Sequence, residues 1–137
     1  MRAVRWRAVL VTCLGLTTVM ADTAGTDLPH RQELRRVDLT ASPNMQVITS
    51  ISEIRKVEMV RRHLHHGIET GYVLQGTLVQ FPGKPPTRLA TGTSVLTLRD
   101  VPHGGFTVVG PQSLKLYSVH VVDKGKPLYE WVDAARR

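Results

Sequence analysis

Short apolar runs separated by turn residues recur along the chain from residue 31 onward, at intervals of about 8–12 residues. Within these runs apolar and polar positions often alternate, and valine, isoleucine, threonine and tyrosine, which favour strands, are frequent. The pattern predicts an all-β fold, built as a sandwich or a barrel. The predicted strands cover residues 45–51, 53–62, 72–81 with a bend, 87–89, 94–98, 106–109 and 114–122. Only residues 129–137 have a pattern that suits an amphipathic helix.

Two of these segments depend on particular residues. Gly76 interrupts the strand pattern of residues 72–81, and a glycine inside a strand marks a bulge or a tight corner. The charges of residues 53–62 would suit a helix, but the apolar positions there lack the period of about 3.6 residues that a helix requires. We therefore predict two strands joined at a corner in the first segment and a strand in the second.

The first 21 residues have the composition of a secretory signal. Arginines at positions 2, 5 and 7 give a positive start, residues 8–20 are mainly apolar, and residues 19–21 offer small side chains where a signal peptidase cleaves. The apolar run is shorter than the roughly 20 residues of a membrane span. We therefore expect export to the periplasm or the medium, with no stable membrane insertion after cleavage. An uncleaved membrane anchor is the alternative.

The predicted organisation has three parts. Residues 1–21 are the signal, residues 22–44 are a polar lead with the first strand region, and residues 45–137 are the barrel domain. A chain of 137 residues holds at most one domain, and its 42% of apolar residues is enough to bury a core. The single cysteine, Cys13, falls in the predicted signal, which excludes a disulfide framework.

The net charge of +7 belongs in part to the predicted signal, which contains three arginines and no acidic residue. Without it, the 18 basic and 11 acidic residues give 18 − 3 − 11 = +4. The remaining basic residues stand in scattered pairs rather than in a stripe interleaved with aromatic side chains. Such pairs are typical of solvated loops and strand edges, so we expect no nucleic-acid partner.

A group of histidines with one glutamate carries the candidate chemistry. Residues two apart on a strand project from the same face, so His63 and His65 can point into one cavity. Glu69 follows four residues later and His103 lies farther downstream. Imidazole suits iron, copper, nickel and zinc, and a carboxylate extends the range to manganese. The spacing differs from that of a helical zinc site, where two histidines stand four apart.

These residues resemble the first conserved motif of the cupins, which has two histidines flanking one residue, then a glutamate, then a glycine, here Gly76. Gly92 and His103 keep the spacing between the first glycine and the last histidine of the second cupin motif. The resemblance extends over roughly residues 45–128. It implies a double-stranded β-helix, or jelly-roll barrel, that holds one divalent transition metal (Fe, Mn, Ni, Cu or Zn). The implied metal ligands are His63, His65, Glu69 and His103.

The chain departs from the cupin pattern at scaffold positions. The leading glycine of the first motif falls on Val57, the usual Pro-x-Gly of the second falls on residues 98–100, and its trailing asparagine falls on Thr107. All four implied ligand positions are kept. The resemblance therefore supports metal binding more than the reaction of any one cupin.

For function the resemblance favours a metal-dependent enzyme, either dioxygenase-like or isomerase- or lyase-like, that acts on a small oxygen-rich or aromatic molecule, and the predicted signal makes it an exported one. Glu69 would ligate the metal or act as the catalytic base. The alternative is a non-catalytic module that binds a metal or a small ligand, and a third possibility is a metal-free barrel that binds a partner. The resemblance also implies a homodimer.

Three further residues have open roles. His66 should face away from its neighbour His65, so we expect it near a ligand residue or in solvent rather than on the metal. His120 in the last long strand can point inward near the site, although a packed or solvent-facing histidine is the more common case. Asp100 can orient a ligand histidine or shape a turn.

Overall fold

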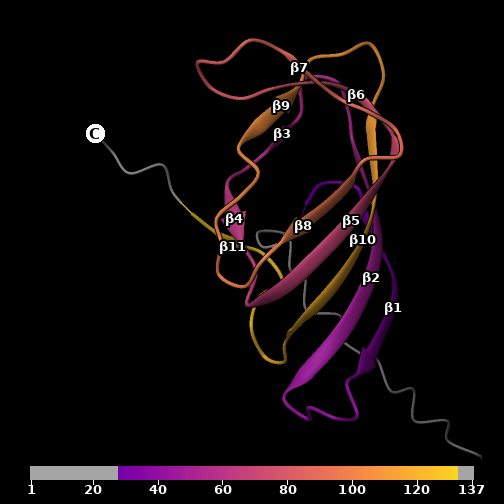
Figure 1. The fold of residues 1–137 in the computed structure, drawn as a ribbon, viewed down its shortest axis with the longest axis vertical. Helices are drawn as coiled ribbons and strands as arrows, with labels where there is room; N and C mark the ends of the chain where they lie inside the picture. The colour runs from indigo at the N-terminus through magenta and orange to yellow at the C-terminus, as the bar shows by residue number, and fades with distance from the viewer. Residues whose placement is uncertain (1–27, 133–137) are drawn as a thin grey trace, which may run out of the picture.

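The computed structural model describes residues 28–132, and among them it contains strands and turns but no helix (Figure 1). This confirms the predicted all-β class. The strands are β1 (Arg31–Asp38), β2 (Met45–Ile54), β3 (Met59–Val60), β4 (His63–Leu64), β5 (Gly67–Gln75), β6 (Thr77–Gln80), β7 (Thr87–Leu89), β8 (Ser94–Thr97), β9 (Phe106–Val108), β10 (Leu114–Asp123) and β11 (Glu130–Trp131). The predicted signal at residues 1–21 lies outside the described residues. Within 28–132 the search for a long apolar helix able to cross a bilayer finds none.

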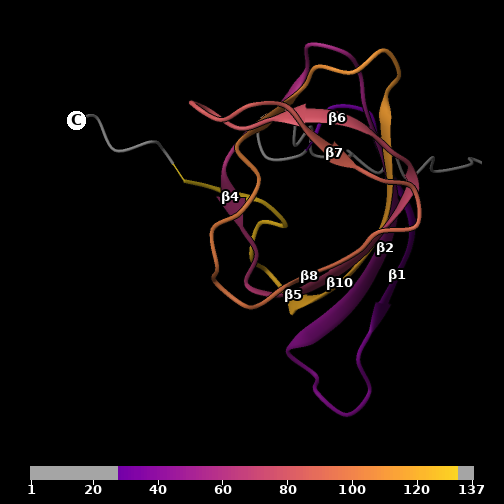
Figure 2. The same ribbon diagram turned by 45° about the horizontal axis from the view of Figure 1, so that its top comes forward.

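The strands form three antiparallel sheets. Five strands pair in the order β1-β2-β10-β5-β8, four pair in the order β3-β9-β6-β7, and β4 pairs with β11. Figure 2 shows the five-stranded sheet on one side of the molecule and β6 and β7 on the other, with β4 at the side between them. This is the predicted jelly-roll barrel, whose two principal sheets face each other.

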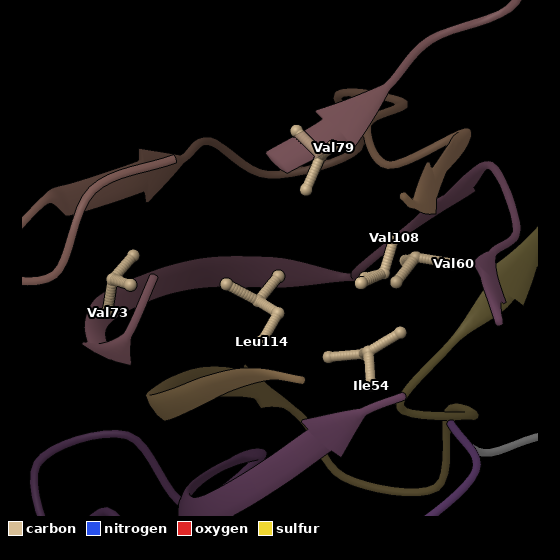
Figure 3. Packing of buried hydrophobic residues seen from close by; sticks show 6 residues of the cluster. All are labelled: Ile54, Val60, Val73, Val79, Val108 and Leu114. Carbon is tan, nitrogen blue, oxygen red and sulfur yellow. The ribbon is translucent and has the colours of Figure 1, made fainter. Parts of the chain in front are cut away.

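An apolar core packs between the facing sheets. Its six buried side chains come from six different strands and point toward one another (Figure 3). They are Ile54, Val60, Val73, Val79, Val108 and Leu114. Burying side chains of this size contributes about 1.5–3 kcal/mol each before the cost of ordering the chain. The core joins the ends of β2, β5 and β10 to the smaller sheet.

Small side chains line the inner face of the large sheet beyond this core. Ser118 on β10 pairs with Ser50 on β2 and with Gly71 on β5, so one row across three strands has almost no side-chain volume. Both serines are buried. In the next row along β10, His120 lies directly opposite Glu69 of β5. The small row therefore leaves space inside the barrel next to a pair of ionisable side chains.

The structure differs from the sequence-based secondary structure at two places. Residues 53–62 are not one strand, because β2 ends at Ile54 and a turn separates it from β3. Local hydrogen bonds favour the turn: the N–H of Arg55 donates to Glu58 Oε2 over 2.7 Å, and the N–H of Glu58 donates to the Arg55 carbonyl over 3.0 Å. Residues 130–131 form β11 rather than a helix because they pair with β4. The predicted corner at Gly76 is confirmed, since β5 ends at Gln75 and β6 begins at Thr77.

Two positions where the cupin pattern has glycine adopt a left-handed backbone without one. Val57 has φ of 64° and Asp100 has φ of 58°. Aspartate tolerates this region, whereas a β-branched valine is strained there. Hydrogen bonds hold the turn nonetheless, since the Val57 N–H donates to the Val108 carbonyl over 2.8 Å.

We expect Val57→Gly to stabilise the protein by about 0.5–1 kcal/mol, because glycine removes the steric strain of the positive φ. The side chain is 77% exposed, so little packing is lost. The measurement is the free energy of unfolding from chemical denaturation. As the control, Val37→Gly removes an exposed valine from β1 and should destabilise the fold. Destabilisation by Val57→Gly as large as that of the control would contradict strain at Val57.

Candidate metal centre

Backbone pairing brings three histidine rings together. His63 and His65 are both buried and Leu64 between them is not, which is the predicted alternation of an extended chain. His103, forty residues later, forms an isolated bridge with His63, with N–H to O distances of 2.9 and 2.8 Å in the two directions. The ring centroids of His63 lie 4.9 Å from His65 and 4.3 Å from His103.

The carboxylate of Glu69 lies against these rings. Its Oε2 is 3.2 Å from His65 Nε2 and 3.1 Å from His103 Nε2. Its Oε1 accepts a hydrogen bond of 2.9 Å from Ser118 Oγ and lies 3.4 Å from His120 Nε2. The structure thus places all four sequence-predicted ligands in one cluster. It adds His120 as a fifth donor.

The tautomer of three rings follows from their backbone contacts. The Nδ1 atom of His63 lies 2.7 Å from the Arg61 carbonyl, that of His103 lies 3.0 Å from the Val101 carbonyl, and that of His65 contacts the Leu128 carbonyl. A carbonyl only accepts hydrogen bonds, so each Nδ1 carries the proton. With Nδ1 as the donor, Nε2 is the nitrogen left to bind a metal, the arrangement that metal-ligating histidines have when their other nitrogen is held by a carbonyl.

The charges inside the cluster are unbalanced. Burial lowers the pKa of His63 to about 4, and it also lowers the pKa of His120, so both rings are neutral near pH 7. Burial by itself would raise the pKa of Glu69, but contacts from His103, His120 and His65 outweigh it and hold that pKa well below its usual range. An ionised carboxylate thus lies among imidazole rings, of which burial favours the neutral form for His63 and His120.

This donor set fits a divalent metal ion. Several imidazole nitrogens and a buried carboxylate that converge on one region are ligand types that divalent transition metals take, and a cation would offset the buried charge. Among the described residues, Nδ1 of His120 has no hydrogen-bond partner and Nε2 has only the 3.4 Å contact to Glu69 Oε1, which is unusual for a fully buried imidazole. Two groups have ligand atoms within 4.8 Å of one another, His63/His65/His103 and His65/Glu69/His120. His65 belongs to both groups.

Sequence reasoning left His120 open, and the structure places it inside. Leu114, Leu116 and Val122 share its face of β10, but Tyr117, Val119 and Val121 on the opposite face are apolar as well. The alternation therefore gave no signal for which face points inward. Pairing with Glu69 decides the direction.

Tyr129 was missed entirely. It is buried, and its ring centroid lies 4.9 Å from His63 and 5.0 Å from His65. The ring of Trp131 stacks on it at 5.7 Å, and the Arg61 guanidinium lies 4.8 Å above the Trp131 ring. The helix-like pattern of residues 129–137 gave no sign of this position, whereas the pairing of β11 with β4 places Tyr129 beside the histidines. Residues 133–137 lie outside the described residues.

His66 faces away from the cluster, as predicted. Its Nδ1 lies 2.9 Å from Asp100 Oδ1 and its Nε2 lies 2.8 Å from Glu130 Oε2. Asp100 thus contacts His66 and not a ligand side chain, although its N–H donates to the His65 carbonyl over 3.0 Å. His66 thus connects two segments through its side chain: the loop before His103, which contains Asp100, and strand β11, which contains Glu130. Strand β11 comes directly after the segment that contains Leu128, whose carbonyl contacts His65.

A cavity of about 210 Å³ adjoins the cluster. His63, Glu69 and His103 form part of its wall, and apolar side chains form most of the remainder. Ser118, from the row of small residues, also lines it. A small molecule held there would contact the candidate metal ligands directly.

Comparisons with known proteins bear on the family and the fold. Residues 51–120 match the family model described as "Cupin domain". A conserved protein with a double-stranded β-helix domain from Klebsiella pneumoniae subsp. pneumoniae MGH 78578 superposes with a TM-score of 0.55 at 15% identity, over 77% of this chain and 84% of that chain. A search of curated proteins gives no match.

Two further solved structures superpose less well. A cupin-like protein from Thermotoga maritima MSB8 has a TM-score of 0.48 at 21% identity, over 74% of each chain. The polyketide cyclase RemF from Streptomyces resistomycificus has a TM-score of 0.47 at 16% identity, over 77% of this chain and 74% of that chain. We base the fold comparison on the Klebsiella protein, whose double-stranded β-helix agrees with the architecture described above.

Proposed function

Because this chain belongs to the cupin family, we propose that it is an exported, mononuclear metal-dependent enzyme that acts on a small molecule inside the barrel. The convergence of His65, His103 and His120 on the Glu69 carboxylate carries this proposal, since imidazole and carboxylate together are ligands of divalent transition metals. The proposed ligands are His63, His65, Glu69 and His103, as the sequence predicts.

A divalent metal bound there would supply Lewis-acid chemistry, or, if it is iron or copper, oxygen chemistry. The protein contributes ligands that are already oriented, because backbone carbonyls fix the three rings and Ser118 holds one oxygen of Glu69. Glu69 also lines the cavity. It is therefore placed to take a proton from a substrate that enters, in the role of general base.

The position of His120 allows two alternative sets of metal ligands in the same cluster. It lies on the side of Glu69 opposite His103, since it faces Oε1 while His103 faces Oε2. It can complete the set with His65 and Glu69, or it can hold Glu69 in place for the other three ligands. Two histidines and one carboxylate is a set that non-haem iron enzymes use with open positions for substrate.

The test of this proposal is elemental analysis of the untagged protein, purified without chelator. We expect about one transition-metal ion per chain, as for a mononuclear site, and its loss in the His63→Ala, His103→Ala double variant. A protein that retains none of the added Fe, Mn, Ni, Cu or Zn would contradict the proposal. Iron or copper would direct substrate screens to oxygen consumption, whereas nickel, manganese or zinc would direct them to isomerase and lyase reactions.

The alternative is a non-catalytic cupin that binds a metal or a small ligand. A protein that holds its metal but converts no compound in either screen would favour it. The predicted export and the predicted homodimer stay predictions. For a dimer, the outer face of the large sheet offers an apolar row formed by Val37, Val47, Val121 and Ile68 on four adjacent strands.

A further inference from the structure

The side chains that line the cavity beside the histidine and glutamate cluster restrict which small molecules can bind there. We propose that the ligand it takes is a compact, monocyclic, largely apolar molecule with one metal-binding oxygen group, such as a phenol or a catechol, and not a sugar or sugar acid. The expectation that the ligand has an oxygen group that binds the metal rests on the proposed function. The expectation of a single, largely apolar ring rests on the volume and polarity of the cavity.

The imidazole and carboxylate groups of the walls lie at one end. His63, Glu69 and His103 form this end, where the metal would bind. Apolar side chains from the core and from both sheets line most of the remainder, namely Leu28, Val60, Leu89, Val95, Phe106 and Leu116. A ligand that spans the cavity therefore needs one polar end and an apolar body.

Few groups could satisfy additional ligand hydroxyls. Besides the candidate metal ligands and Tyr129, the polar side chains of described residues that line the cavity are Ser52, Thr97 and Ser118. The hydroxyl of Ser118 already donates to Glu69. Among the described residues, no lysine or arginine lines it. Each buried hydroxyl without a partner lowers affinity by roughly tenfold. A polyhydroxylated molecule would leave several hydroxyls unpaired.

The volume fits a single ring. An apolar cavity of about 150 Å³ accommodates benzene, so a cavity of about 210 Å³ accommodates a ring with short substituents. Phe106 gives an aromatic wall, and its own ring is held edge-to-face by Phe81 at 5.6 Å and 61°. Aromatic rings pack well against such a wall in offset or edge-to-face geometry.

The experiment compares two ligands that both chelate metals through neighbouring oxygens. Catechol and gluconate are titrated into the zinc-loaded protein by calorimetry, because zinc is redox-inert and keeps catechol unchanged. We expect catechol to bind at least about tenfold more tightly than gluconate, whose extra hydroxyls lose their partners. Equal or tighter binding of gluconate would overturn the proposal.

Cavity-filling variants locate the binding. Leu116→Phe and Val95→Phe place extra volume in the cavity from two different strands, and each should weaken catechol binding at least about tenfold while zinc content stays the same. Leu78→Phe is the matched control, since Leu78 is partly exposed on β6 and does not line the cavity. Unchanged catechol affinity in either folded cavity variant would overturn the proposal.

A further probe separates this inference from the proposed function. Toluene has no oxygen and needs no metal, so its binding is followed by ligand-observed NMR in protein treated with chelator. Toluene binding that Leu116→Phe abolishes would support the apolar cavity even if the protein held no metal. Absence of toluene binding in wild-type protein would overturn the inference, even if the metal content were as proposed.

Discussion

We expect the His65→Ala variant to bind a transition metal at least about 100-fold more weakly than the wild-type protein. His65 is fully buried, belongs to both candidate donor groups, and places its Nε2 atom 3.2 Å from Glu69 Oε2. Residues that merely orient a ligand already contribute about 10- to 100-fold to metal affinity, so the loss of a shared ligand should cost at least as much. The measurement is competition with a chromophoric chelator of known affinity.

The control for this variant is the neighbouring histidine. His66→Ala removes an imidazole that contacts Asp100 and Glu130 outside the cluster, and its metal affinity should stay within about tenfold of wild type. His65→Asn is the second variant, because its amide nitrogen occupies the position of Nδ1 and keeps a donor for the Leu128 carbonyl, while no group replaces Nε2. Wild-type metal affinity in a folded His65→Asn protein would contradict ligation by His65.

We expect Gly76→Ala to destabilise the fold by at least about 4 kcal/mol, enough to leave much of the protein unfolded. A Cβ atom at this position would lie 2.3 Å from the Leu89 carbonyl oxygen and 2.4 Å from the Thr91 nitrogen. These are backbone atoms and cannot rotate away. The corner is also held by hydrogen bonds, since the Gly76 N–H donates to Thr91 Oγ1 over 2.8 Å and its carbonyl accepts from Gln112.

Chemical denaturation with circular dichroism measures this effect. Gly125→Ala is the matched control because its added Cβ meets no atom within 4 Å, although φ of 74° makes alanine mildly strained there. The control should cost about 1–2 kcal/mol. A loss of similar size for Gly76→Ala would mean that the segment around Ala90 can move aside, and that close backbone packing does not fix the corner.

The sequence predicted correctly those features that depend on only a few neighbouring residues. The alternation of residues 63–65 placed two imidazoles on one face because extended backbone has a period of two, and the structure agrees. Gly76 predicted a corner because a side chain there would obstruct the backbone. The spacing of His63, His65, Glu69 and His103, through its resemblance to cupin motifs, also anticipated which side chains the barrel brings together.

The turn at residues 55–58 shows where local reasoning failed. The sequence contained the cue, since Val57 stands at the position of the motif's leading glycine, but a valine by itself favours extended structure. The turn in which Val57 has a positive φ is held by its hydrogen bond to Val108 on the neighbouring strand β9 and by the Arg55 to Glu58 hydrogen bonds. The β propensity of a single residue does not anticipate contacts of that kind.

What the sequence alone determined is the all-β class, the corner at Gly76 and the face shared by His63 and His65, because each follows from a period or a steric limit within a few residues. Only the tertiary structure decided that His120 faces Glu69 and that Tyr129 lies beneath the histidines. Strand β10 carries apolar side chains on both faces, so its inward side was set by register with β2 and β5. The polarity and size of the cavity were decided in the same way, by which side chains from distant strands come to line one space.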